Sequence, residues 1–290
     1  MKQHEIPGRV ALAVGQGGLP KVVVTSKAGT AELYLHGAHL TGFQKNGEPP
    51  LLFLSGESLF AAGQAIRGGV PICFPWFGGR EGDVAHGFAR LTEWELVKTS
   101  AAPDGTVTLR LRLPEIPARP EWKDLQTEFI VTVSDQLTME LRVTNASAQP
   151  QAFEGCLHAY FAVGDIAQVA IIGLKGLQYL DKVDHFKQKL ESGDVVRITS
   201  EVDRVFLNAT GPVEIDDAKL RRKILIEKTG SASTVLWNPW IAKAKAMSDF
   251  GDEEYQGMVC VEAGNVGDAK ISLAPGKTSS LKMIVQSRIG

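Results

Sequence analysis

Two residues of this sequence combine acid/base chemistry with apolar surroundings. His158 stands in the centre of the run Phe153–Phe161, and Glu262 follows the apolar residues 258–261. An imidazole has an ordinary pKa of about 6.5, so it can donate and recover a proton near neutrality. Burying a carboxylate in an apolar strand costs free energy unless it is paired or hydrogen-bonded. Such a residue is therefore expected to have a partner in the core or a role in function. A histidine in such a run is more often a hydrogen-bonded core residue, so the pattern alone leaves both interpretations open.

Two arginines lie in equally unusual segments. Arg67 precedes two glycines and the apolar and aromatic stretch 70–78, and Arg90 closes the segment His-Gly-Phe-Ala-Arg that begins at His86. Arginine in such company needs an anion, which is either a core carboxylate or a ligand. If residues 86–90 form a strand, His86, Phe88 and Arg90 share one face. Two guanidiniums in one pocket would hold a phosphate dianion through charge-assisted hydrogen bonds.

The elements that must position these residues are predicted to be β-strands. Apolar and polar residues alternate along 107–113 and 139–144, as in strands with one wet face. The turn tripeptide Pro103-Asp104-Gly105 predicts a hairpin that joins 94–98 to 107–113. Further strand-like runs lie at 21–25, 32–43, 51–54, 129–133, 152–163, 223–227, 258–261 and 281–285.

Helical periodicity is scarce in this sequence. Only 241–247 and 58–65 could form short helices, and the Pro-rich stretch 114–120 is expected to be a loop between neighbouring strands. No linker or repeat of fixed period divides the chain. We therefore predict an all-β fold, a large sandwich of antiparallel sheets that forms a single domain over residues 1–290.

Composition narrows the partners and the compartment. The 31 Lys and Arg nearly balance the 33 Asp and Glu, so neither nucleic acid nor a membrane surface is an expected partner. The sequence begins with no signal peptide and holds no run of about 18 apolar residues. Cys73, Cys156 and Cys260 are predicted to be buried thiols in a reducing compartment, which favours the cytoplasm. We expect a monomer with no cofactor and no metal, since His36 and His39 lack further ligands at a sensible spacing.

Taken in order, several segments resemble the signature of hexose-6-phosphate mutarotases, the glucose-6-phosphate 1-epimerase branch of the aldose 1-epimerase family. The resemblance covers roughly residues 22–285 and rests on 66–78, 86–90, His158, 202–204, 235–240 and 260–264. It implies a galactose mutarotase-like β-supersandwich. It also implies an isomerase that interconverts the α and β anomers of glucose 6-phosphate or related aldohexose 6-phosphates, with a small sugar phosphate as the partner.

The resemblance also assigns roles to individual residues. It makes His158 the general acid and Glu262 the general base. The sequence departs from the family at Ala85, where a polar substrate contact such as Gln is common. The implied substrate-binding residues are the phosphate-binding Arg67 and Arg90, Asp203 as an acceptor for sugar hydroxyls, and His86.

Two other functions remain open from the sequence. An aldose 1-epimerase for unphosphorylated sugars would use the same acid and base, with the two arginines as structural residues. A noncatalytic carbohydrate-binding sandwich would need neither. A glycosidase would more commonly place two carboxylates at the bond, whereas the strongest partner of Glu262 here is a histidine.

Overall fold

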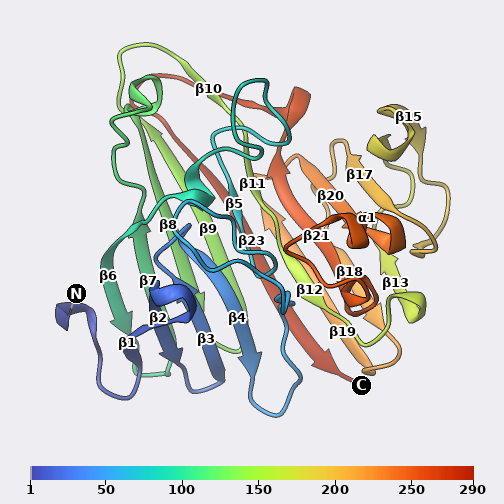
Figure 1. The fold of residues 1–290 in the computed structure, drawn as a ribbon, viewed down its shortest axis with the longest axis horizontal. Helices are drawn as coiled ribbons and strands as arrows, with labels where there is room; N and C mark the ends of the chain where they lie inside the picture. The colour runs from blue at the N-terminus through green and yellow to red at the C-terminus, as the bar shows by residue number, and fades with distance from the viewer. Residues whose placement is uncertain (1) are drawn as a thin grey trace.

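The largest sheet of the computed structural model, which describes residues 2–290, has nine strands (Figure 1). Every neighbouring pair in it is antiparallel, and alternate residues of its long strands are buried, as the period-two pattern requires. Its strand order is β16 (Val195–Val196), β13 (Val169–Ile172), β18 (Val213–Asp217), β19 (Arg222–Thr229), β23 (Thr278–Ile289), β9 (Leu137–Asn145), β8 (Leu125–Val133), β7 (Val107–Arg112) and β6 (Glu95–Ala101).

A second, eight-stranded antiparallel sheet carries most of the candidate site residues. Its strand order is β15 (Lys187–Leu190), β14 (Gln178–Asp181), β17 (Val202–Phe206), β20 (Ser233–Asn238), β21 (Met258–Asn265), β11 (Gly155–Leu157) and β5 (Ile72–Cys73), with β12 (Tyr160–Ala162) also paired to β21.

The remaining elements are short. A four-stranded meander contains β1 (Val10–Val14), β2 (Pro20–Thr25), β3 (Gly29–Tyr34) and β4 (His39–Lys45), and β10 (Gln151–Phe153) pairs with β22 (Ile271–Leu273). Within residues 2–290 the only α-helix is α1 (Trp240–Ala246). Short 3-10 helices are η1 (Lys2–His4), η2 (Gln16–Gly18), η3 (Ala89–Leu91), η4 (Pro120–Trp122), η5 (Ile166–Gln168), η6 (Lys182–Asp184), η7 (Glu254–Gly257) and η8 (Gly267–Ala269).

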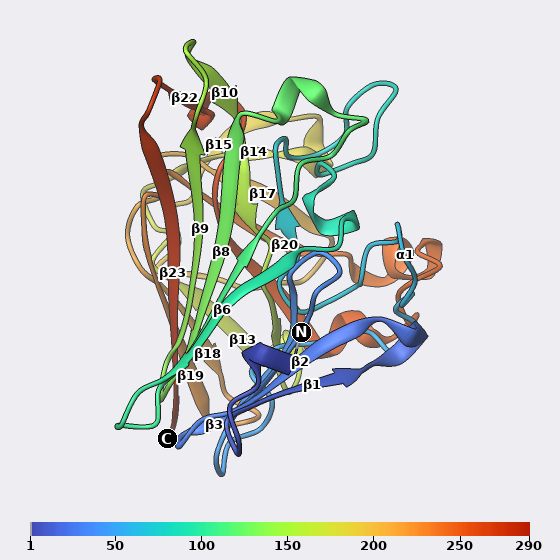
Figure 2. The same cartoon turned by 90° about the vertical axis from the view of Figure 1, so that its left-hand side faces the viewer.

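The two large sheets form the layers of a sandwich. Turned by 90°, the molecule shows β23, β9 and β8 along one side and α1 at the opposite side (Figure 2). Strand β21 of the eight-stranded sheet packs against β23 of the nine-stranded sheet, and apolar side chains of both sheets belong to one buried cluster. The other face of the eight-stranded sheet is therefore left to form a site.

The sequence predicted most of this architecture. The all-β sandwich is confirmed, and so are the hairpin of β6 and β7, the loop at 114–120 between β7 and β8, and the helix at 241–247. The run 32–43 belongs to two strands, and 152–163 contains three. The predicted helix at 58–65 is wrong: that segment is irregular, and Gly63 adopts a left-handed φ of 74°, which ends any helical turn. No helix among the described residues has both the length and the hydrophobicity to cross a bilayer.

Candidate active site

The face of the eight-stranded sheet that is turned away from the nine-stranded sheet forms the floor of a cavity of about 660 Å³, a size typical of pockets for small molecules. Cross-strand partners in this sheet place side chains in rows on the same face. One row contains Leu180, Val205, Val235 and Glu262, and the next contains Asp203, Trp237, Cys260 and Tyr160. Apart from Cys260, all of these residues line the cavity.

Strand register explains why His158 and Glu262 meet. Leu157 of β11 pairs with Ala263, and Tyr160 of β12 pairs with Cys260, so both strands lie against β21 in a single register. The two residues between these strands, His158 and Ala159, are thereby held beside β21, where Val261 donates its N–H to the carbonyl of Ala159 and the His158 side chain meets Glu262. The sequence alone did not show this pairing, because the two residues are 104 positions apart and no local sequence pattern indicates that they are in contact.

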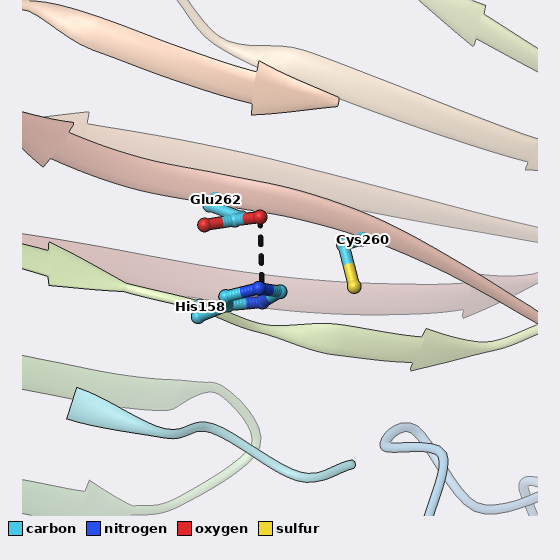
Figure 3. A group of neighbouring side chains, drawn as sticks. All are labelled: His158, Cys260 and Glu262. Carbon is cyan, nitrogen blue, oxygen red and sulfur yellow. Dashed lines mark ion pairs between the residues drawn. The ribbon is translucent and has the colours of Figure 1, made fainter. Parts of the chain in front are cut away.

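The imidazole and the carboxylate are in contact (Figure 3). The Nδ1 atom of His158 lies 3.3 Å from Oε1 of Glu262, and the other carboxylate oxygen, Oε2, accepts a hydrogen bond of 3.3 Å from the thiol of Cys156. Only 8% of His158 and 1% of Glu262 are exposed, yet both line the cavity. The Nδ1 atom has no aligned hydrogen-bond partner among the described residues, so it differs from an ordinary core histidine.

Burial sets the protonation of this pair. It lowers the pKa of His158 well below 6.5, and the positive charges of Arg67 and Arg90 act in the same direction. Burial also raises the pKa of Glu262 well above 4.5, and the hydrogen bond from Cys156 opposes the rise. Burial therefore favours the neutral form of both groups in the empty site, an uncharged imidazole beside a protonated carboxyl group.

This protonation predicts how stability depends on pH. Folded Glu262 keeps its proton above its ordinary pKa of 4.5, where the unfolded chain loses it, so this residue's contribution to stability falls as pH rises. Glu262→Gln removes that loss. The Tm of the variant minus that of the wild type, measured by calorimetry, is expected to grow between about pH 5 and pH 8. A difference that is constant over this range would mean that folded Glu262 is ionised.

Arg67 reaches the cavity beside the acid/base pair. Its Nε and Nη2 atoms donate to Oδ2 of Asp249 at 3.1 and 3.0 Å, and Nη1 donates to the hydroxyl of Tyr160 at 3.0 Å. The ring of Tyr160 stacks on His158 with the ring centres 4.8 Å apart. A guanidinium has five N–H donors, so these contacts leave donors for a ligand.

The segment 86–90 differs from its prediction. It is a turn followed by η3, not a strand, and His86 and Gly87 have φ values of 64° and 73°. His86 lines the cavity as a neutral ring: burial and the nearby cations lower its pKa to about 3, and its Nδ1 accepts the N–H of Gly78. Arg90 does not line the cavity, and its Nη2 donates to the carbonyl of Ala85 at 2.8 Å. Its role in phosphate binding thus stays a prediction.

Asp203 lines the cavity together with a lysine that the sequence analysis missed. Oδ2 of Asp203 lies 2.7 Å from Nζ of Lys182, and both residues line the cavity. Lys182 belongs to a short turn among other charged residues, so its sequence context resembles that of a solvated surface lysine. Only the pairing of β14 with β17 brings it into the site.

Cys260 lies next to the acid/base pair. One ligand atom from each of His158, Cys260 and Glu262 lies within 4.8 Å of the others, and nitrogen, sulfur and oxygen are donors that zinc accepts (Figure 3). Burial raises the pKa of the Cys260 thiol well above 9.0, which keeps it protonated and opposes ligation. All three cysteines are free and buried, as predicted.

Known proteins are similar to this chain in sequence and in fold. Residues 20–286 match the family model of aldose 1-epimerase. A "putative glucose-6-phosphate 1-epimerase" of Cenchrus ciliaris is 37% identical over 273 residues, which cover 90% of this chain and 82% of that protein. A Salmonella typhimurium protein of the same description is 37% identical over 248 residues, covering 84% of this chain and 82% of its own length. The crystal structure of a "putative mutarotase" from Salmonella typhimurium superposes with a TM-score of 0.91 at 32% identity, covering 99% of this chain and 96% of that one.

The sandwich and its buried imidazole–carboxylate pair thus define a galactose mutarotase-like protein with a cavity suited to a small molecule. The chain belongs to the aldose 1-epimerase family. The fold and the family of isomerases that the sequence predicted are both confirmed.

Proposed function

We propose that this protein is a hexose-6-phosphate mutarotase that interconverts the α and β anomers of glucose 6-phosphate and related aldohexose 6-phosphates. The observation that carries the proposal is the contact of 3.3 Å between His158 and Glu262 in a cavity large enough for a hexose phosphate. The two relatives described as glucose-6-phosphate 1-epimerases support the phosphorylated substrate.

Anomer exchange needs one base and one acid. The hydroxyl at C1 loses a proton to Glu262 while the ring oxygen O5 gains one from His158, and the C1–O5 bond breaks. The open-chain aldehyde rotates about the C1–C2 bond and the ring closes on the other face of C1, with both proton transfers reversed. The chemistry returns both groups to their starting states, so it requires neither a metal nor a cofactor.

The reactive state needs a carboxylate and an imidazolium. This state holds the same single proton as the neutral imidazole and carboxyl group of the empty site. Converting one state into the other therefore needs no net gain or loss of a proton by the pair, whose Nδ1 and Oε1 atoms lie 3.3 Å apart. Activity then falls where the pair gains a second proton or loses the one that it holds, which predicts a bell-shaped dependence of rate on pH.

The phosphate takes no part in the reaction, so its contacts serve to orient the sugar. Arg67 lies beside Tyr160, which stacks on His158, and it is the proposed anchor for the phosphate. Arg90, which does not line the cavity, would add positive charge near the phosphate. His86 and Asp203 would contact the sugar. We further propose a cytoplasmic monomer with no nucleic acid or membrane partner, because the charge is balanced and the cysteines are free thiols.

The preference between phosphorylated and free sugar tests this function. Wild-type protein is expected to accelerate anomer exchange of glucose 6-phosphate with a far higher kcat/KM than that of glucose, as measured by exchange NMR at equilibrium. Arg67→Ala should raise KM for glucose 6-phosphate by about tenfold or more, since a charge-assisted hydrogen bond is lost, and should change KM for glucose little.

An aldose 1-epimerase for free sugars is the competing outcome. It is favoured by the salt bridge of 3.0 Å from Arg67 to Asp249, which already neutralises the proposed anchor. A higher kcat/KM for glucose than for glucose 6-phosphate would remove the phosphate hypothesis. Binding of glucose 6-phosphate without faster exchange would indicate a noncatalytic sugar-binding protein.

A further inference from the structure

We infer that Lys182 is a specificity-determining residue of this site. Paired with Asp203, it presents one hydrogen-bond donor and one acceptor side by side, and this pair recognises adjacent hydroxyl groups of the sugar ring. The inference rests on the proposed function, because it concerns the same cavity and the same sugar.

Sheet register places Lys182 opposite Asp203. Leu180 pairs with Val205 and Asp181 with Arg204, and the next residue of the chain, Lys182, lies beside Asp203 and forms an ion pair with it. Lys182 begins η6, whose backbone is fixed by Asp181: its carboxylate accepts the N–H groups of the two residues that follow Lys182. The backbone at Lys182 is therefore fixed, and its side chain lines the cavity.

The pair has hydrogen-bonding capacity left for a ligand. An ammonium carries three donors and a carboxylate about four acceptor sites, whereas the contact of 2.7 Å between Nζ and Oδ2 uses one of each. The side chains of Lys182 and Asp203 are 24% and 11% exposed, and both line the cavity. Nζ also lies 5.7 Å from the ring centre of Phe77, which holds the ammonium over the cavity wall.

The position of the pair indicates which part of the substrate it meets. Asp203 and Tyr160 are at opposite ends of one row of side chains, three strand spacings or about 14 Å apart at the backbone. Arg67 donates to the hydroxyl of Tyr160, so the proposed phosphate anchor and the Lys182–Asp203 pair face each other across the cavity. Glu262 lies in the neighbouring row on β21, and His158 stacks on Tyr160 near the Arg67 end. A sugar whose phosphate is bound by Arg67 therefore directs its ring hydroxyls toward the Lys182–Asp203 pair.

A comparison of deoxy sugars tests this assignment. With glucose 6-phosphate, Lys182→Met is expected to lower kcat/KM by about tenfold or more, since a hydrogen bond from a charged donor is lost. The 2-, 3- and 4-deoxy analogues of glucose 6-phosphate each lack one ring hydroxyl. The wild-type kcat/KM should be lowered for the analogue that lacks the hydroxyl contacted by Lys182. For that analogue, the difference between wild type and Lys182→Met disappears. Lys182→Arg, which keeps the charge and the donors, should recover part of the loss.

Lys187→Met is the matched control, because Lys187 follows the same turn, pairs with Asp184 at 2.9 Å and is exposed. It should leave kcat/KM unchanged. The inference is overturned if folded Lys182→Met stays within twofold of wild type on glucose 6-phosphate, or if it loses the same factor on all three deoxy analogues. Lack of activity in the wild type would instead defeat the proposed function itself.

Discussion

Replacing Glu262 by glutamine is expected to slow anomer exchange of glucose 6-phosphate by about 10²–10⁴-fold in kcat, the range typical for loss of a general base. Glutamine has nearly the same size and keeps an acceptor oxygen, but it cannot take the proton from the hydroxyl at C1. Because the residue is only 1% exposed and contacts Cys156 and His158, no other base replaces it from solvent. KM should change little, and the variant should fold with at least the stability of the wild type.

Asp268→Asn provides the control for Glu262→Gln. Asp268 is an exposed carboxylate that lines the same cavity, so Asp268→Asn makes the same change from a carboxyl group to an amide without touching the acid/base pair. Its kcat should stay within a few-fold of wild type. If the two variants lose activity equally, the effect of Glu262 is one of cavity charge, and its role as the base is refuted.

His158→Ala is expected to cause a loss of kcat of similar size, about 10²–10⁴-fold, because the ring oxygen then leaves C1 without receiving a proton. The substitution also opens space between Tyr160 and Trp237, whose rings contact the imidazole at 4.8 and 6.1 Å between centres. Added imidazole should enter that space and restore part of the rate, whereas an equal concentration of a non-basic heterocycle should not.

Rescue by imidazole separates proton transfer from packing. A purely structural role for His158 would give a variant with a lowered Tm and an activity that does not respond to imidazole. Full activity of folded His158→Ala without any additive would contradict the assignment of His158 as the acid.

The fold was easier to predict from the sequence than the arrangement of the site, for physical reasons. Strands such as β7 and β9 alternate apolar and polar residues because one face of the nine-stranded sheet meets solvent, and that pattern was easily interpreted. Strand β21 is buried on both faces, so Glu262 stood out as a carboxylate within an apolar run. The candidate chemistry was thus visible in residue types.

Features that depend on long-range pairing could not be predicted. The position of Lys182 is set by the register of β14 against β17, which leaves no trace in a short, charged turn. The strand considered for 86–90 does not form, because two consecutive left-handed residues turn the chain there. As a result, His86 reaches the cavity while Arg90 bonds to a main-chain carbonyl, and the shared face expected for them does not form.

Exchange NMR of glucose 6-phosphate at anomeric equilibrium tests the central claim most directly, with wild-type protein compared with the His158→Ala, Glu262→Gln double variant. In the presence of wild type, the exchange rate between the α and β signals should rise in proportion to protein concentration. The double variant should leave the spontaneous rate unchanged. An exchange rate that still rises in proportion to the concentration of the folded double variant would contradict the assignment of these two residues as the acid and the base.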